Sequence, residues 1–585
     1  MEYKKENKIC QNCKKDFTIE PDDFGFYEKI KVPPPTFCSQ CRLQRRMVWR
    51  NDWHLFKKKD ARTGEEIFSF LPEESPVKIY DRDYWISDAW NPMEYGREYD
   101  FSRPFFEQFK ELLYTVPLPA HSMFDIVNCQ YCTNANNIKG CYLVRGASFT
   151  EDSAYLIWDQ ESKQCLDSHM TNKCELSYGN VDTSTCYRTF FSVDCESSQE
   201  LTLCKDCVGC NSCIASTSLR NKSYCIFNVQ YTREEYLEKL KSFNLGSNEA
   251  FQELKSKAYK HWMKYPQKFI HSRQNVNVSG DYIYESKNAH DCYRVRGLED
   301  CKFIQNILVG PAKDCYDYAN FGDNAELIYE SLIAGQGVYN VKFSTQTVSN
   351  IKNLTYCVFC FPSNSDLFGC VSLRNKQYCI FNKQYTKEEY EKLVPKIIKH
   401  MNEMPYIDKN GRVYKYGEYF PSELTYFPYK ATASYEWFPL GEKEAKEKGF
   451  LWYEIARQNH KITLNNKDIP DNIKDVDENI FNQVIECVHR ESCEHECTGA
   501  FRVIKMELDF LKRMNLPLPR LCTNCRHYER LLLRNSPTFY KRECMCEKKN
   551  HFHGAEKCKI EFETSYAPER SEIVYCEKCY QQEVY

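Results

Sequence analysis

A pattern of paired cysteines occurs twice in this chain of 585 residues and limits the folds open to it. The two copies lie about 484 positions apart, and each has 24 residues between its first and second cysteine pair. The pairs are Cys10 with Cys13 and Cys38 with Cys41 near one end, and Cys493 with Cys497 and Cys522 with Cys525 near the other. Flanking residues match without a gap, from Phe17 with Phe501 to Asn51 with Asn535. Two cysteine pairs supply four thiolates to one closed tetrahedral site, so the pattern predicts one structural zinc module used twice.

A third zinc site is predicted at the C-terminus, which would bring the total to about three zinc ions. Its predicted ligands are Cys544, Cys546, Cys576 and Cys579. Two ligand positions stay open. Cys558, His551 or His553 is an alternative to Cys546, because all three lie between the two pairs. In the second module Cys487 or His489 is an alternative to Cys493, whose spacing to Cys497 is one residue longer than in the first module.

A predicted helix follows each second cysteine pair, which is the order of elements in a treble-clef module. Both helices carry arginines four residues apart, and such residues share one helix face. The arginines are Arg42, Arg45, Arg46 and Arg50 in the first module and Arg526, Arg530 and Arg534 in the second. The whole chain has a net charge of −3. Arginine suits phosphate oxygens, so these faces favour RNA or a ribonucleoprotein as partner. The alternative is that they pair with acidic residues of the chain, which would favour a protein partner on the central region.

The central region, residues 122–385, repeats at two scales. Residues 219–236 match residues 373–390 at 15 of 18 positions. Cysteines also recur every 21 residues, as at Cys165, Cys186 and Cys207. A fixed period near 20 residues is typical of stacked turns. The pattern predicts a parallel β-solenoid in two copies, with one turn per 21 residues and these cysteines stacked above one another.

The predicted fold is multidomain and mainly β, with a central β-solenoid between zinc modules and short helical segments. Capping-box patterns at Thr232 and Thr386 start helices that follow the two copies, and Pro104 starts another. The predicted domains are a first module (1–62), an aromatic segment (63–121), solenoid copy 1 (122–231), a helical segment (232–271), solenoid copy 2 (272–385), a connector (386–480), a second module (481–540) and a C-terminal zinc ribbon (541–585).

Two other sets of residues suggest alternative functions. The run Cys204, Cys207, Cys210 and Cys213 resembles an iron–sulfur motif, but its last gap is short and the following proline is missing, so packing inside the solenoid is favoured. Asp167, Asp182 and Asp194 would suit an enzyme that acts on a polymer such as a polysaccharide in a solenoid groove, although aspartate is also common in turns. No nucleophile–histidine–acid set stands out. A non-enzymatic scaffold or adaptor is therefore the favoured function.

Several longer motifs resemble one bacterial family. They are VPPPTFCSQCRLQRRMVWRN, YWISDAW with YGREYDFSRPFFEQF, the two LRNK-x-YCIFN-x-QYT repeats and FETSYAPERSEIVYCEKCY. They are similar to Cys-rich zinc-ribbon proteins of candidate-phyla-radiation (Patescibacteria) bacteria, and the resemblance spans nearly the whole chain. It implies a bacterial cytoplasmic protein with zinc modules and carries over no activity. The longer spacing before Cys497 departs from the pattern. No apolar run approaches the roughly 20 residues of a membrane span, so no membrane association is expected.

Overall fold

The computed structural model describes residues 3–454, 460–490 and 492–584, which form two compact units. Unit 1 combines Met1–His121 with Ile270–Glu454, and unit 2 combines Ser122–Phe269 with Ile455–Tyr585. Unit 1 therefore holds the first cysteine module and solenoid copy 2. Unit 2 holds solenoid copy 1, the second cysteine module and the C-terminal ribbon. No helix in the described part of the chain is long and apolar enough to cross a membrane.

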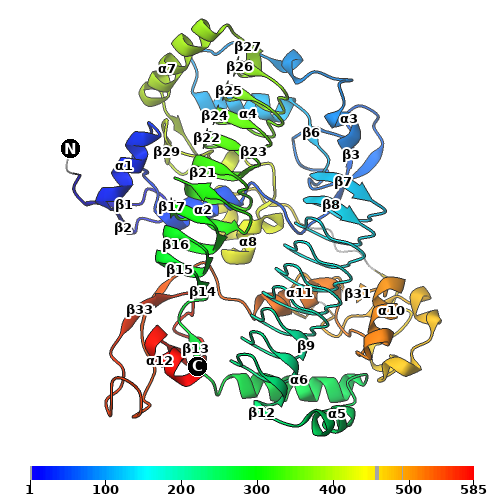
Figure 1. The fold of residues 1–585 in the computed structure, drawn as a ribbon. Coiled ribbons are helices and arrows are strands. Elements are labelled where there is room, and N and C mark those ends of the chain that lie inside the picture. Colours follow the sequence, from blue (N-terminus) through cyan, green and yellow to red (C-terminus); the bar gives the residue numbers. More distant parts are fainter. Residues whose placement is uncertain (1–2, 455–459, 491, 585) are drawn as a thin grey trace. The chain divides into compact units, whose positions relative to one another are not determined.

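Copy 1 lies in unit 2 and is a β-solenoid with 12 residues per turn. Parallel bridges join residues 12 positions apart, and they recur at every third residue from Gln130↔Tyr142 to Val208↔Arg220. Each turn thus consists of four sides of three residues, which Figure 1 shows as closely stacked coils. Longer strands occur at the two ends of the copy. They are β7 (Met123–Val127), β8 (Ala135–Lys139), β9 (Gln199–Thr202), β10 (Asn211–Ile214), β11 (Ser223–Ile226) and β12 (Val229–Gln230).

The three residues of one side differ in backbone conformation, hydrogen bonding and burial, as Asn172, Lys173 and Cys174 illustrate. The amide of Asn172 donates to a carbonyl on the next turn, at 3.0 Å, and the amide of Lys173 donates to a carbonyl on the preceding turn, at 2.8 Å. Lys173 has a φ of 52°, and every third residue from Asp125 to Phe227 likewise has a positive φ. Cys174 is buried. The left-handed residue turns the chain, so that each third side chain enters the interior.

Interior amides donate to side chains rather than to the backbone ladder. The amide of Cys204 donates to Ser192 Oγ at 3.1 Å, that of Ser192 to Asn180 Oδ1 at 3.0 Å, and that of Asn180 to Ser168 Oγ at 3.1 Å. These four residues are 12 positions apart and form one column. Cysteine suits such columns because it is small and its thiol donates to carbonyls, as Cys174 Sγ does to Thr183 O at 3.5 Å.

The predicted solenoid is confirmed, but the predicted turn of 21 residues is wrong. Cys165, Cys186 and Cys207 are all buried inside copy 1. Twenty-one is a multiple of the three-residue side but not of the 12-residue turn, so the three cysteines lie on different sides of the solenoid. They recur because any interior position can accept cysteine.

Copy 2 lies in unit 1 and has longer strands and less regular turns. Its parallel partners are 11 to 14 positions apart, as in Val276↔Lys287, Ala325↔Val338 and Leu298↔Ala312. Figure 1 shows these strands as a stack of arrows. Its strands are β14 (Ser272–Arg273), β15 (Val276–Tyr284), β16 (Lys287–Arg296), β17 (Leu298–Lys302), β18 (Gln305–Ile307), β19 (Ala312–Lys313), β20 (Tyr316–Ala319), β21 (Ala325–Gly335), β22 (Val338–Lys342), β23 (Thr345–Val348), β24 (Ile351–Thr355), β25 (Ser365–Phe368), β26 (Gln377–Ile380) and β27 (Lys383–Gln384).

Helices follow both copies at the predicted positions. The capping boxes at Thr232 and Thr386 are both formed. Helix α5 (Arg233–Ser242) then follows copy 1, with α6 (Asn248–Trp262) after it, and α7 (Lys387–Glu403) follows copy 2.

The remaining elements belong to the cysteine modules and the connecting segments. In unit 1 they are β1 (Glu6–Ile9), β2 (Asp16–Ile19), α1 (Pro21–Lys29), α2 (Ser39–Met47), β3 (Phe56–Lys59), β4 (Glu66–Ser69), β5 (Ile79–Tyr80), α3 (Arg82–Ile86), η1 (Pro92–Tyr95), α4 (Phe105–Thr115), β6 (Leu118–Pro119), β28 (Tyr406–Ile407), β29 (Val413–Tyr414), η2 (Ser422–Leu424), η3 (Tyr429–Ala431), α8 (Ala433–Trp437) and α9 (Glu442–Glu447). In unit 2 they are β13 (Gln267–Lys268), η4 (Asn466–Asp468), η5 (Ile473–Asp475), η6 (Glu478–Asn482), β30 (Ile485–Glu486), β31 (Ala500–Phe501), α10 (Lys505–Met514), α11 (Thr523–Leu531), β32 (Tyr540–Glu543), β33 (Glu561–Thr564), β34 (Val574–Tyr575) and α12 (Glu577–Val584).

The left-handed corners generate a prediction. Lys173 is exposed and has a φ of 52°, so Lys173→Val should lower the free energy of unfolding by roughly 1–3 kcal/mol, because a β-branched side chain is strained there. Glu175→Val is the matched control: this residue is also exposed but lies in the parallel ladder, where valine should change stability by less than about 0.5 kcal/mol. Urea unfolding of both variants measures the difference. Equal losses would show that the corners are not constrained by φ.

Candidate metal centres

The first module brings its four predicted ligands together. Cys10 and Cys13 lie at the turn between β1 and β2, Cys38 caps the N-terminus of α2, and Cys41 lies in the first turn of that helix. The four Sγ atoms all lie within 4.8 Å of one another. The amide of Cys38 also donates to Cys10 Sγ at 3.3 Å. A hairpin and a helix N-terminus thus create a four-thiol site that could hold a metal ion.

The thiols of this site influence one another electrostatically. Hydrogen bonding with Cys38 lowers the pKa of Cys10, whereas hydrogen bonding with Cys10 raises the pKa of Cys41. Thiolates this close repel one another, so all four ionise together only when a cation balances their charge.

In the second module the predicted ligand Cys493 is replaced by Cys487. Cys487, Cys497, Cys522 and Cys525 form the four-thiol group. Cys487 follows β30, which pairs antiparallel with β31, so the hairpin carries Cys487 rather than Cys493 to the site. Cys493 matches Cys10 in sequence but lies in the loop of that hairpin. Its Sγ is 3.7 Å from Cys525 Sγ, and it belongs to a second group with His489, His495 and Cys525.

In the C-terminal ribbon Cys558 replaces the predicted ligand Cys546. Cys544, Cys558, Cys576 and Cys579 form the buried four-thiol group. Cys544 directly follows β32 and Cys558 shortly precedes β33, and these strands pair antiparallel, so their ends meet. Cys546 belongs to a second group with His551, His553 and Cys579.

The arginines of both module helices are buried in the same arrangement. In unit 1 the carboxylate oxygens of Asp317 lie 2.8 Å from Arg42 Nε and 3.0 Å from Arg46 Nη1. In unit 2 the carboxylate oxygens of Asp167 lie 2.6 Å from Arg530 Nη1 and 3.3 Å from Arg526 Nη1. The arginines correspond at an offset of 484 positions and the aspartates at an offset of 150. Each duplicated module is therefore fastened to its solenoid copy at the equivalent corner. We call each pair of arginines with its aspartate a clamp.

The neighbouring arginines are also buried and paired. Arg45 contacts Glu330 at 2.8 Å and Glu418 at 2.9 Å. Burial disfavours its charge, but these two carboxylates outweigh that effect and hold the pKa of Arg45 above its usual range. Arg50 pairs with Asp52, and Arg534 lies 4.0 Å from Asp182 and 2.9 Å from His169.

The arginines do not form exposed helix faces in this structure. Their side chains are 8% exposed or less. A spacing of four residues places side chains on one helix face, but it does not say whether that face meets water or protein. Three glutamate partners were not predicted from the sequence: Glu330 and Glu418, which contact Arg45, and Glu507, which lies 2.6 Å from Arg526 Nη1. The sequence does contain one indication of this pairing: an aspartate occurs at equivalent positions of the two copies, Asp167 and Asp317.

The other candidate residues lie along the solenoid. Cys204, Cys207, Cys210 and Cys213 are buried at successive interior positions, where each thiol donates to backbone carbonyls. Asp167, Asp182 and Asp194 all lie at left-handed corners. Asp167 and Asp182 face arginines, so they do not form the open acidic groove that the polymer-enzyme alternative requires.

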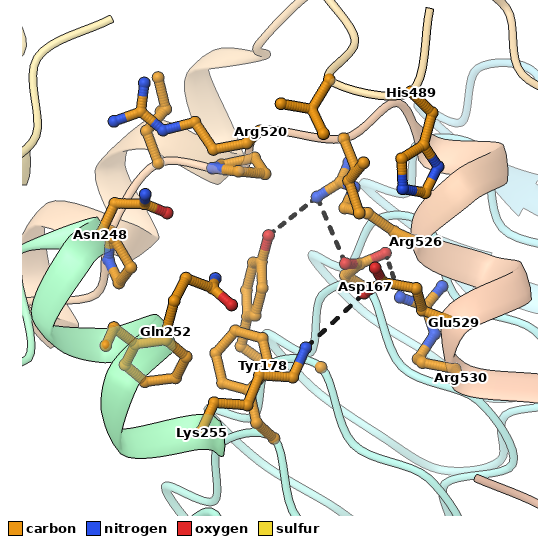
Figure 2. A pocket seen from close by; sticks show the side chains of 18 of the residues that line it. Asp167, Tyr178, Asn248, Gln252, Lys255, His489, Arg520, Arg526, Glu529 and Arg530 are labelled. Carbon is orange, nitrogen blue, oxygen red and sulfur yellow. Dashed lines mark hydrogen bonds and ion pairs between the residues drawn. The ribbon is translucent and has the colours of Figure 1, made fainter. Parts of the chain in front are cut away.

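A cavity of about 370 Å³ borders the clamp of unit 2. Figure 2 shows Arg526 pointing to both Asp167 and the Tyr178 hydroxyl, and Lys255 of α6 reaching toward Glu529. The lysine and the two arginines at Asp167 and Glu529 are thus held in ion pairs, whereas Arg520, which also lines the cavity, donates to backbone carbonyls.

Comparison with known proteins adds no assignment: no protein-family model matches this chain, and no curated protein matches it significantly. The candidate site therefore has to be interpreted from its own geometry.

The clamp predicts that Asp317→Asn is strongly destabilising. It would remove the carboxylate nearest to both Arg42 and Arg46, and breaking a buried ion pair typically costs about 3–5 kcal/mol. Asp314→Asn is a matched control, because Asp314 also lies at a left-handed corner but pairs with the half-exposed Lys29, and such surface pairs contribute about 0–1 kcal/mol. Denaturant unfolding compares the two. Similar losses would contradict the clamp.

Proposed function

We propose that this chain is a non-enzymatic, zinc-binding scaffold in which metal-stabilised modules lock a β-solenoid into a rigid form. The clamp carries this proposal. Each module helix begins at two thiol ligands and presents two arginines, one turn apart, to one solenoid aspartate. A metal bound at the helix N-terminus would fix the direction of that helix and so hold the arginines against Asp317 or Asp167.

The chemistry of the ligands favours zinc as the metal. Four thiolates around one closed site are the usual ligand set of structural zinc, whereas catalytic zinc keeps a position open for water. In zinc-finger peptides the binding of structural zinc contributes about 10–16 kcal/mol of apparent free energy. That magnitude is enough to hold a module together against the cost of burying its arginines.

The burial of the arginines favours a protein partner over RNA. RNA could contact Arg42 or Arg526 only if these left their carboxylates, and a buried charge without its partner is costly. A rigid solenoid that presents a long surface for docking a protein is therefore the best-supported adaptor role. The paired state of Asp167 and Asp182 does not favour the polymer-enzyme alternative, and the interior positions of Cys204–Cys213 favour packing over an iron–sulfur cluster.

The scaffold proposal predicts that the metal ligand Cys41 supports copy 2. Cys41→Ala should lower the zinc content and increase hydrogen exchange of residues 316–331, which include Asp317 and Glu330. Cys301→Ala is the control: Cys301 is equally a buried cysteine of unit 1 but belongs to no metal group among the described residues. It should leave the zinc content unchanged. Elemental analysis and hydrogen-exchange mass spectrometry provide both readouts. Unchanged exchange after zinc loss would contradict the coupling.

The same proposal predicts little binding to RNA. Titration of the full chain with a labelled single-stranded RNA at low salt should show no binding with the steep salt dependence that phosphate contacts produce. Binding whose salt slope decreases in a folded Arg526→Gln variant would instead establish the RNA interpretation.

A further inference from the structure

We propose that the second module and the C-terminal ribbon each hold two zinc ions that share one cysteine thiolate. This inference builds on the proposed four-thiol zinc sites and raises the expected content from three to five zinc ions per chain. The key observation is that two ligand groups meet at one residue in each module. Cys525 belongs to both groups of the second module, and Cys579 belongs to both groups of the ribbon.

The number of ligands fits two metal ions with one bridge. Each module supplies five cysteines and two histidines, which is the seven ligands that two tetrahedral ions need when they share one of them. The second module uses Cys487, His489, Cys493, His495, Cys497, Cys522 and Cys525. The ribbon uses Cys544, Cys546, His551, His553, Cys558, Cys576 and Cys579.

The distances around the shared thiolate of the second module, Cys525, match this coordination. Two thiolates on one zinc ion lie about 3.8 Å apart, given bonds of about 2.3 Å at the tetrahedral angle. Cys525 Sγ is 3.9 Å from Cys487 Sγ, which belongs to the four-thiol group, and 3.7 Å from Cys493 Sγ, which belongs to the other. One sulfur atom thus lies at coordination distance from the ligands of both ions.

The histidines of the ribbon are oriented as metal ligands. His551 directs Nδ1 toward Cys546 Sγ at 3.1 Å, and its Nε2 lies 3.4 Å from a Glu583 carboxylate oxygen. His553 directs Nε2 toward the same sulfur at 3.3 Å, and its Nδ1 lies 2.6 Å from Glu556 O. One nitrogen faces the cluster and the other meets a carboxylate or a carbonyl, which is the usual outer support of a metal-bound histidine.

Each histidine of the second module has a buried ring nitrogen that could bind a metal ion. His489 Nδ1 and His495 Nδ1 are buried, and neither has a hydrogen-bond partner among the residues that the structure describes. The two rings lie 5.4 Å apart, and the ring of His495 stacks on Tyr528 at 5.4 Å, which holds its plane. A buried polar atom without a partner is costly, and a metal ion would satisfy it.

In both modules the ligands of the two groups follow one another along the chain in the same way, and the first module differs from both. The segment from Cys487 to Cys497 has a four-thiol ligand at each end and three ligands of the second group between them, and the segment from Cys544 to Cys558 repeats that order. In the first module only two residues separate Cys10 from Cys13. That turn has no room for three further ligands, and the module has one group. The longer loops thus account for the second ion.

A shared thiolate also improves the charge balance. One zinc ion with four thiolates has a net charge of −2, whereas two zinc ions with five thiolates and two neutral imidazoles have a net charge of −1. A lower net charge reduces the penalty of burying the cluster. The arrangement has no open coordination position, so we infer a structural role.

The test is native mass spectrometry and zinc X-ray absorption on the full chain. Five zinc ions are expected, with about 3.2 sulfur and 0.8 nitrogen neighbours per ion, because sixteen thiolate and four imidazole bonds are divided among five ions. A zinc–zinc distance of about 3.5–3.8 Å should accompany them, because two bonds of about 2.3 Å to one sulfur span that range when the angle at sulfur lies between about 100° and the tetrahedral angle. Three ions with sulfur neighbours alone would overturn this inference and leave the proposed four-thiol sites intact. Fewer than three would overturn both.

Variants assign the additional ions to their modules. The double substitution His489→Ala with His495→Ala should lower the content from five to four, and so should His551→Ala with His553→Ala. His460→Ala is the matched control, since His460 is exposed and belongs to no described metal group, and it should retain five. A module whose double variant keeps all its zinc lacks the shared-thiolate cluster. If a variant does not fold, the absorption spectrum of the parent decides.

Discussion

The solenoid depends on how it satisfies one backbone amide in every three. The first two residues of each side donate to neighbouring turns, whereas the third points its amide and its side chain into the interior. At several interior positions a small polar side chain one turn away accepts this hydrogen bond, as Ser192 does for Cys204 and Ser153 does for Cys165. This requirement explains why serine, threonine, asparagine and cysteine fill a core that would otherwise be aliphatic. It also explains the high cysteine content without assigning each thiol to a metal.

The sequence predicted features that depend on neighbouring residues and missed those that depend on distant ones. Cys38 and Cys41 could be placed because their spacing and the following helix are local. The turn length was wrong because a three-residue side makes 21 as acceptable a cysteine spacing as 12. Cys493 was chosen over Cys487 by its match to Cys10, and only the pairing of β30 with β31 shows which cysteine reaches the site. The burial of Arg42 depends on Asp317, which is 275 residues away.

The two units repeat one construction with different numbers of candidate metal-binding groups. In each, a helix that begins at a thiol site presents two arginines to an aspartate at a left-handed corner. An aspartate at a corner of the solenoid projects outward while its backbone stays in the ladder, so it offers an anchor without disturbing the stack. The thiol group, the helix direction and the ion pairs are thereby linked in one arrangement, in which the loss of the aspartate leaves buried arginine charge less compensated.

The crossed order of modules and copies has a consequence for biosynthesis. The first module leaves the ribosome before copy 2, and the aspartate that Arg42 contacts is encoded 275 residues after it. At about 5–20 residues per second, the nascent module waits roughly 15–55 s with its arginines unpaired. Copy 1 waits longer still, because Arg526 lies even further from Asp167 along the chain. Neither clamp can form before both of its halves have been translated, so a chain that ends between the two halves would leave one half without its partner.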